Sequence, residues 1–133
     1  MAGNKNKQIK KILIIEDDPL HRELEKSLFE EAGYIISEAE NAQQGTSAAI
    51  KNTPDLIILD YQLPGMTGIQ VVDALKDNLI TRNIPCVIVT ATATEDEVEK
   101  FKSAKICGYI TKPIDTRTFV KRLIKLVKDG KQS

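Results

Sequence analysis

In Ile12-Leu13-Ile14-Ile15-Glu16-Asp17-Asp18-Pro19 an apolar run leads directly into three acids and a helix start. Four consecutive branched apolar residues are typical of a strand that is buried on both faces of a parallel sheet. Asp18-Pro19 combines a helix N-cap with a proline at the first helical position. The stretch therefore predicts a strand, a short acidic turn and a helix, in that order.

The same alternation of apolar runs and amphipathic stretches continues along the chain. The predicted strands are Ile12–Ile15, Tyr34–Ala39, Leu56–Leu59, Cys86–Val89 and Tyr109–Thr111. Five strands that alternate with five helices predict an α/β domain whose parallel sheet is covered on both faces. Because crossovers are right-handed, few strand orders remain, and the common one for five strands is the flavodoxin-like order 2-1-3-4-5. We therefore expect a three-layer (βα)5 fold.

The predicted helices have recognisable ends and one apolar side each. Gly33 ends the first helix, Thr94 to Glu97 form a capping box before the fourth, and Asp115 and Gly130 bound the last. The expected apolar positions are Leu20, Leu24, Leu28 and Ala32 in the first helix, Ile69, Val72 and Leu75 in the third, Val98 and Phe101 in the fourth, and Phe119, Leu123, Leu126 and Val127 in the last. We expect these sides to pack on the sheet.

Length and composition exclude several classes of protein. The chain has 133 residues, 41% of them hydrophobic and 29% charged, which suits one globular domain. Its apolar runs are too short for a membrane span, and its polar start lacks a secretory signal. Basic and acidic residues number 19 each, so no basic excess is available for nucleic-acid binding. Two cysteines, Cys86 and Cys107, are too few for a disulfide framework, and a cytoplasmic chain is expected.

The domain is predicted to occupy most of the chain. We expect residues 1–8 to form a flexible extension, residues 9–129 the domain, and residues 130–133 a tail. The chain ends just after the last predicted helix, which leaves no room in it for a DNA-binding or enzymatic output domain. A single-domain protein and a domain cut from a longer chain both fit this pattern.

Polar residues follow four of the five predicted strands. They are Glu16 and Asp17 after the first strand, Asp60 after the third, Thr90 after the fourth and Lys112 after the fifth. In the predicted order the first and third strands are neighbours, about 4.8 Å apart. Carboxylates at such distances raise one another's pKa unless a cation intervenes. We expect Lys112 and an Mg²⁺ ion to supply that charge, with Asp17 and Asp60 as ligands, Glu16 acting through a water, and a main-chain carbonyl just past Asp60.

This set of residues suits phosphoryl transfer. A carboxylate can act as the nucleophile that forms an acyl phosphate, while the metal and Lys112 neutralise charge on the transferring oxygens. Thr90 can donate a hydrogen bond to one of those oxygens, and Ala91 is small enough to leave room for the group. No Walker loop or Gly-rich turn follows the first strand, so the predicted donor is a phosphorylated molecule other than ATP.

The chain resembles the receiver domain of bacterial two-component response regulators, of the single-domain type, from Lys10 to Lys128. The resemblance rests on Ile14-Ile15-Glu16-Asp17-Asp18-Pro19, Leu59-Asp60-Tyr61-Gln62-Leu63-Pro64-Gly65-Met66-Thr67-Gly68, Val89-Thr90-Ala91 and Gly108-Tyr109-Ile110-Thr111-Lys112-Pro113. It implies that Asp60 accepts a phosphoryl group from a phosphohistidine on a sensor histidine kinase or a histidine phosphotransfer protein. It also implies Mg²⁺ (or Mn²⁺ in its place) at Glu16, Asp17, Asp60 and the backbone carbonyl of Gln62, and a cis Lys112–Pro113 bond.

The resemblance further implies a switch. Thr90 moves toward the new phosphoryl group, Tyr109 swings into the vacated space, and the face formed by the fourth helix, fifth strand and fifth helix changes shape for a partner protein. Gln62 and Thr92 stand where family members tune spontaneous dephosphorylation. The implied protein is a monomer or a phosphorylation-dependent dimer that acts as a phosphoacceptor, not as an enzyme on other substrates. The sequence departs from the family pattern at Lys105-Ile106-Cys107, where family members often have a pair of small residues of the Gly-Ala type.

Other readings of these residues remain open. Glu16 to Asp18 alone would be a solvated loop, and a metal-dependent phosphohydrolase would share the topology, although its usual second carboxylate is here Gln62. A flavin carrier is disfavoured because acids occupy the place of the flavin phosphate. His21 is expected to be solvated on the polar side of the first helix. The basic last helix is interpreted as a solubilising face, with a docking surface for an acidic helix as the alternative.

Overall fold

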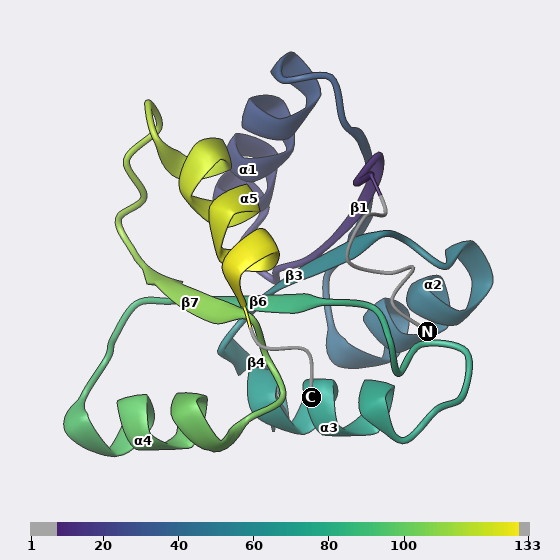
Figure 1. Ribbon diagram of the computed structural model, residues 1–133, viewed down its shortest axis with the longest axis vertical. Helices are drawn as coiled ribbons and strands as arrows, with labels where there is room; N and C mark the ends of the chain where they lie inside the picture. Colours follow the sequence, from purple (N-terminus) through teal and green to yellow (C-terminus); the bar gives the residue numbers. More distant parts are fainter. Residues whose placement is uncertain (1–7, 131–133) are drawn as a thin grey trace.

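A five-stranded parallel sheet forms the centre of the domain (Figure 1). The computed structural model describes residues 8–130. The strands of the sheet are β1 (Lys11–Ile15), β2 (Ile35–Ala39), β3 (Leu56–Asp60), β6 (Cys86–Thr90) and β7 (Gly108–Thr111). Their order is β2-β1-β3-β6-β7, and every neighbouring pair is parallel. Since β6 and β7 are the fourth and fifth predicted strands, the predicted order 2-1-3-4-5 is confirmed.

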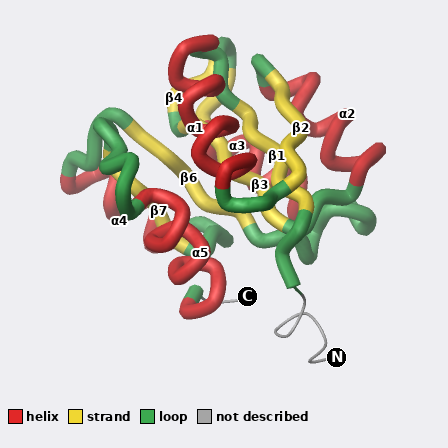
Figure 2. The backbone as a smooth tube through the Cα atoms, turned by 90° about the horizontal axis from the view of Figure 1, so that it is seen from above, coloured by secondary structure: helices red, strands yellow, loops and turns green. Residues whose placement is uncertain are grey.

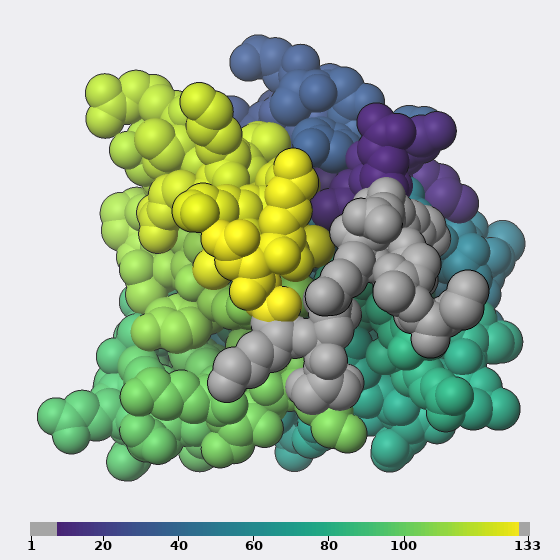
Figure 3. Space-filling model, in the orientation of Figure 1, coloured from purple at the N-terminus to yellow at the C-terminus, as the bar shows by residue number. Residues whose placement is uncertain are grey.

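Helices cover both faces of this sheet (Figures 1 and 2). One face carries α1 (Pro19–Glu31) and α5 (Phe119–Asp129), and the other carries α2 (Ala42–Asn52), α3 (Gly68–Lys76) and α4 (Glu95–Ser103). In Figure 3 the outer side of α5, in yellow, lies at the surface beside α1, in blue. With helices on both faces of the sheet, the expected three layers are present. Within residues 8–130, every helix is too short or too polar to traverse a bilayer.

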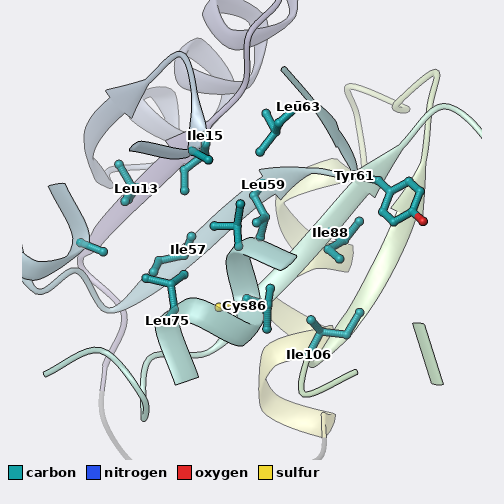
Figure 4. Close-up of a cluster of buried hydrophobic side chains, with 14 of the residues drawn as sticks. Leu13, Ile15, Ile57, Leu59, Tyr61, Leu63, Leu75, Cys86, Ile88 and Ile106 are labelled. Carbon is teal, nitrogen blue, oxygen red and sulfur yellow. The ribbon is translucent and has the colours of Figure 1, made fainter. Parts of the chain in front are cut away.

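Alternate residues of each central strand pack into two cores, one on each face of the sheet. The core under α2, α3 and α4 contains Leu13, Ile15, Ile57, Leu59 and Ile88 from the strands (Figure 4). The core under α1 and α5 contains Ile12, Ile14, Ile58, Val87 and Val89. Both sides of β1, β3 and β6 are thus apolar, which explains why their sequences are nearly uninterrupted runs of branched apolar residues. Only the residues at their carboxyl ends are free to be polar.

The buried side of α1 differs from the predicted one. Leu20 is 82% exposed and Leu24 is also exposed, whereas Glu25 and Phe29 are buried. Phe29 packs edge-on against Phe119 of α5, with ring centroids 5.5 Å apart. The leucine positions and the Glu25–Phe29 positions have the same helical spacing, so the spacing alone does not decide which side of the helix is buried. The aromatic contact with α5 decides it. The predicted apolar side was therefore wrong for Leu20, Leu24 and Ala32, whereas Leu28 does pack against the core.

Two further details differ from the sequence-based expectations. The helix α5 begins at Phe119 and not at Asp115, because residues 115–118 form a turn in which the Asp115 carbonyl accepts the N–H groups of Thr118 and Phe119. Directly after β3, the short strands β4 (Gln62–Leu63) and β5 (Met66–Thr67) form an antiparallel hairpin that the sequence did not predict. The predicted extension and tail, residues 1–8 and 130–133, lie almost entirely outside the described residues.

Candidate functional site

The carboxyl ends of four strands bring the predicted site residues to one edge of the sheet. Glu16 and Asp17 follow β1, Asp60 is the last residue of β3, Thr90 is the last of β6 and Lys112 follows β7. Backbone ladders join β1 to β3, β3 to β6 and β6 to β7, so each of these positions is held by a buried strand. The fold therefore gathers groups that are separated by as many as 96 residues in the chain.

Lys112 lies between two of the carboxylates. Its Nζ is 3.1 Å from Glu16 Oε1 and 3.6 Å from Asp60 Oδ1. The other oxygen of Glu16 accepts the backbone N–H of Asp18 at 3.2 Å. Carboxylate oxygens of Glu16, Asp17 and Asp60 all lie within 4.8 Å of one another, and only Asp17 is exposed. The three predicted side-chain ligands and the predicted lysine are thus brought together.

The electrostatics of this group leave negative charge uncompensated. Burial raises the pKa of Glu16, and the nearby charge of Asp60 raises it further. Burial also raises the pKa of Asp60, although Lys112 partly offsets the effect. Burial alone would lower the pKa of Lys112, but attraction to Glu16 and Asp60 outweighs it and the pKa is raised. Three carboxylates with one ammonium group fit a divalent cation, and an all-oxygen donor set suits Mg²⁺.

The two predicted switch residues occupy different surroundings. Thr90 is fully buried, and its hydroxyl donates to the Thr92 carbonyl at 2.9 Å and accepts the Thr92 N–H at 3.3 Å. Tyr109 is half-buried, and its ring centroid lies 4.8 Å from that of Phe101 on α4. Phe101 in turn packs edge-on against Tyr61, the residue after Asp60, with ring centroids 5.2 Å apart.

Gln62 lies exposed at the start of β4, and the role of its carbonyl as a metal ligand stays a prediction.

Sequence reasoning missed the α1 side chains that support the site. Arg22 Nη1 donates to the Glu16 carbonyl at 2.7 Å. His21 Nδ1 lies 3.6 Å from Glu16 Oε1 and 3.2 Å from Glu25 Oε2. The expectation that His21 is merely solvated was therefore wrong, because this side chain is largely buried among carboxylates. The spacing of His21 and Glu25, one helical turn apart, was the available signal.

Comparison with known proteins assigns the chain to a family. The family model described as the response regulator receiver domain matches residues 12–124. The polar-differentiation response regulator DivK of Brucella anthropi is 34% identical over 114 residues, which span 86% of this chain and 93% of DivK. The chain belongs to the response regulator receiver domain family. The phosphate regulon transcriptional regulatory protein PhoB of Pseudomonas aeruginosa is 40% identical over 114 residues, and the receiver domain spans 50% of its length.

Solved structures agree with this receiver fold. The chemotaxis response regulator CheY4 of Vibrio cholerae superposes with a TM-score of 0.82 at 24% identity, covering 90% of this chain and 99% of that one. The signal receiver domain of a histidine kinase from Syntrophus aciditrophicus gives a TM-score of 0.80 at 28% identity, covering 93% and 94%. The receiver domain also has the cis Lys112–Pro113 bond that the sequence resemblance implied. The flavodoxin-like fold is thus established in the receiver form.

Proposed function

We propose that Asp60 accepts a phosphoryl group from the phosphohistidine of a sensor histidine kinase or a histidine phosphotransfer protein, in a reaction that requires Mg²⁺ or Mn²⁺. The observation that carries the proposal is the position of the Asp60 carboxylate. It is 8% exposed at the edge of the sheet, 3.6 Å from Lys112 and grouped with Glu16 and Asp17. The domain that carries this activity is proposed to span residues 9–129, in a cytoplasmic protein.

The transfer is a nucleophilic displacement at phosphorus. An Asp60 carboxylate oxygen forms a bond to the phosphorus atom while the P–N bond of the phosphohistidine breaks, and the imidazole nitrogen keeps the electron pair. Lys112, free to turn from Glu16 toward the incoming group, donates to a phosphoryl oxygen. A bound Mg²⁺, held by Asp17, Asp60 and the Gln62 carbonyl with Glu16 acting through a water, would supply further positive charge to the phosphoryl oxygens.

The same step drives the proposed switch. Thr90 exchanges its hydrogen bond to the Thr92 carbonyl for one to a phosphoryl oxygen, which alters the loop that leads to α4. Tyr109 then moves in its contact with Phe101, and the α4–β7–α5 face changes shape for a downstream protein. The domain acts as a monomer or as a phosphorylation-dependent dimer. It assists only its own phosphorylation and dephosphorylation, and it does not bind nucleic acid directly or a membrane.

Intact-mass spectrometry after incubation with acetyl phosphate tests the proposal. We expect a single phosphoryl adduct on the wild type that requires Mg²⁺ and disappears in Asp60→Asn. The matched control is Asp73→Asn, which removes an exposed carboxylate on α3 and should leave the adduct intact. An adduct that survives in Asp60→Asn would place the acceptor elsewhere. Labelling by a phosphorylated histidine phosphotransfer protein extends the test to the proposed donor.

A further inference from the structure

Glu16, His21 and Glu25 form a second group of metal-ligating side chains beside the proposed magnesium site. One ligand atom of each lies within 4.8 Å of the others. We propose that these three side chains bind a transition-metal ion with the preferences of Zn²⁺. This site goes beyond the proposed phosphoryl acceptance and does not depend on it, although the two sites share Glu16.

The spacing of the donor atoms fits a zinc ion. Bonds of 2.0 to 2.1 Å in a tetrahedral zinc site place neighbouring ligand atoms about 3.3 Å apart. His21 Nδ1 is 3.2 Å from Glu25 Oε2 and 3.6 Å from Glu16 Oε1. Only small side-chain adjustments are therefore needed to place one ion at bonding distance from these atoms.

The backbone holds the three donors in place. His21 and Glu25 are one turn apart on α1, so both side chains lie on the same side of the helix. Glu16 directly follows β1, and Arg22 of the same helix donates to its carbonyl at 2.7 Å. The site is thus built on a strand end and a helix, which are more rigid supports than a mobile loop.

The burial of the Glu25 carboxylate is the observation that points to a bound ion. The Glu25 side chain is 1% exposed, and burial raises its pKa. Glu25 Oε2 and His21 Nδ1 are both buried, and they face each other at 3.2 Å. A buried carboxylate is costly unless a positive charge compensates it. A protonated His21 would pair with Glu25, and Lys112 compensates part of the Glu16 charge, whereas a divalent ion would compensate both carboxylates at once.

The donor types select a different ion from that of the neighbouring site. A nitrogen donor with two carboxylates suits Zn²⁺ and similar transition metals, whereas Mg²⁺ prefers oxygen donors and retains several waters. Lys112 Nζ lies 3.1 Å from the same oxygen of Glu16 that faces His21. The oxygen that would bind the ion thus also accepts a hydrogen bond from Lys112, as metal-ligating carboxylates commonly do.

Nuclear magnetic resonance of the His21 ring during a Zn²⁺ titration tests the site. His21 is the sole histidine of the sequence, so its imidazole signals report on one residue, provided that the protein carries no histidine tag. The titration uses a Cys107→Ser background, which removes a half-buried thiol that could also bind zinc. We expect the ring signals to shift and to saturate at one equivalent of Zn²⁺. Unchanged ring signals would overturn the proposal and leave an ion pair only.

Calorimetric titration of matched variants assigns the other ligands. Glu25→Gln and His21→Gln should each weaken Zn²⁺ binding at least about tenfold. Glu23→Gln removes an exposed carboxylate of α1 that belongs to neither metal group, so it should bind Zn²⁺ like the wild type. Circular dichroism establishes that each variant is folded. A folded Glu25→Gln protein with unchanged affinity would overturn the site, whatever the outcome of the phosphorylation experiment.

Discussion

Asp60 lies at the boundary between the apolar core and solvent, and this position governs its ionisation. It ends β3, whose other residues are all buried, so its carboxylate is largely removed from water. That burial raises its pKa, and the neighbouring charge of Asp17 adds to the effect. The metal-free folded state therefore holds the Asp60 charge at a cost that the unfolded chain does not bear. Phosphoryl acceptance requires this charge, so we interpret the cost as part of the function.

Replacing this charge is expected to stabilise the metal-free protein. Asp60→Asn should raise the free energy of unfolding at pH 7 by about 1 kcal/mol, a figure that allows for solvent screening. A carboxyl group whose pKa is raised by folding destabilises the folded state above that pKa. The advantage of the variant should therefore shrink as the pH falls through the folded-state pKa of Asp60. Urea denaturation in a chelator at several pH values measures both effects.

Asp73→Asn, at an exposed position on α3, should change the unfolding free energy little at any pH. An Asp60→Asn protein that is no more stable than the wild type at pH 7, or whose advantage grows toward low pH, would contradict the electrostatic account.

The two cysteines are expected to differ sharply in reactivity. Burial raises the pKa of Cys86 to about 11, so roughly one thiol in a thousand is ionised at pH 8. Cys107 is half-buried and packs with the opposite core. A disulfide reagent should therefore modify Cys107 in the native protein and reach Cys86 only after unfolding. Thiol titration of the wild type and Cys107→Ser measures this, and rapid native modification of Cys86 would contradict it.

Among the helices, most of the expected starts and apolar faces were correct, including the buried faces of α3, α4 and α5. The Asp18 cap with Pro19 and the Thr94–Glu97 capping box are confirmed, because capping depends on residues that are close in sequence. The buried face of α1 was predicted only in part, since an aromatic contact with α5 turns Leu20 and Leu24 toward solvent while Leu28 packs on the core. The start expected for α5 at Asp115 was also wrong. Asp115 is a good cap residue, but here it forms a turn and the helix begins at Phe119.

The entry of α3 ties this helix to the acceptor loop. The Gly68 N–H donates to the Tyr61 carbonyl at 2.6 Å. A Cβ at Gly68 would lie 2.7 Å from the Asp60 carbonyl oxygen and 3.1 Å from Tyr61 Cα. Both contacts are with backbone, which cannot move aside without shifting Asp60. This close approach, and not a turn with positive φ, explains the need for glycine at this position.

Gly68→Ala is therefore expected to impair both folding and phosphorylation. Overpacking should cost about 1 to 3 kcal/mol of stability. Displacement of the Asp60 backbone should lower the rate of labelling by acetyl phosphate about tenfold or more. Val72→Ala in the same helix should cost about 2 kcal/mol through a cavity but leave the labelling rate of the folded protein unchanged. Equal rates in the two variants would show that Gly68 does not position the acceptor.

At the scale of the whole molecule, the site was predictable because the sheet is parallel. Strand order alone places the residues after β1, β3, β6 and β7 on one edge, so Glu16, Asp17, Asp60 and Lys112 were found from the sequence. The burial of His21 with Glu25, and the bond between Thr90 and the Thr92 loop, depend on how helices and loops pack on that sheet. The one-turn spacing of His21 and Glu25 indicates only that both side chains lie on the same side of α1, and it does not indicate that this side is buried.

The acidic edge also links metal binding to the stability of the whole domain. If Mg²⁺ binds only the folded state, an Mg²⁺ concentration of ten times its Kd should add about 1.4 kcal/mol to the free energy of unfolding, or roughly 5 °C to the Tm. Potassium chloride of equal ionic strength is the control, because salt alone screens the repulsion among Glu16, Asp17 and Asp60. Asp60→Asn should gain less from Mg²⁺ than the wild type, since a ligand is lost. Thermal unfolding by circular dichroism measures all three cases, and a wild-type Tm that rises no further in Mg²⁺ than in potassium chloride would contradict a magnesium site at this edge.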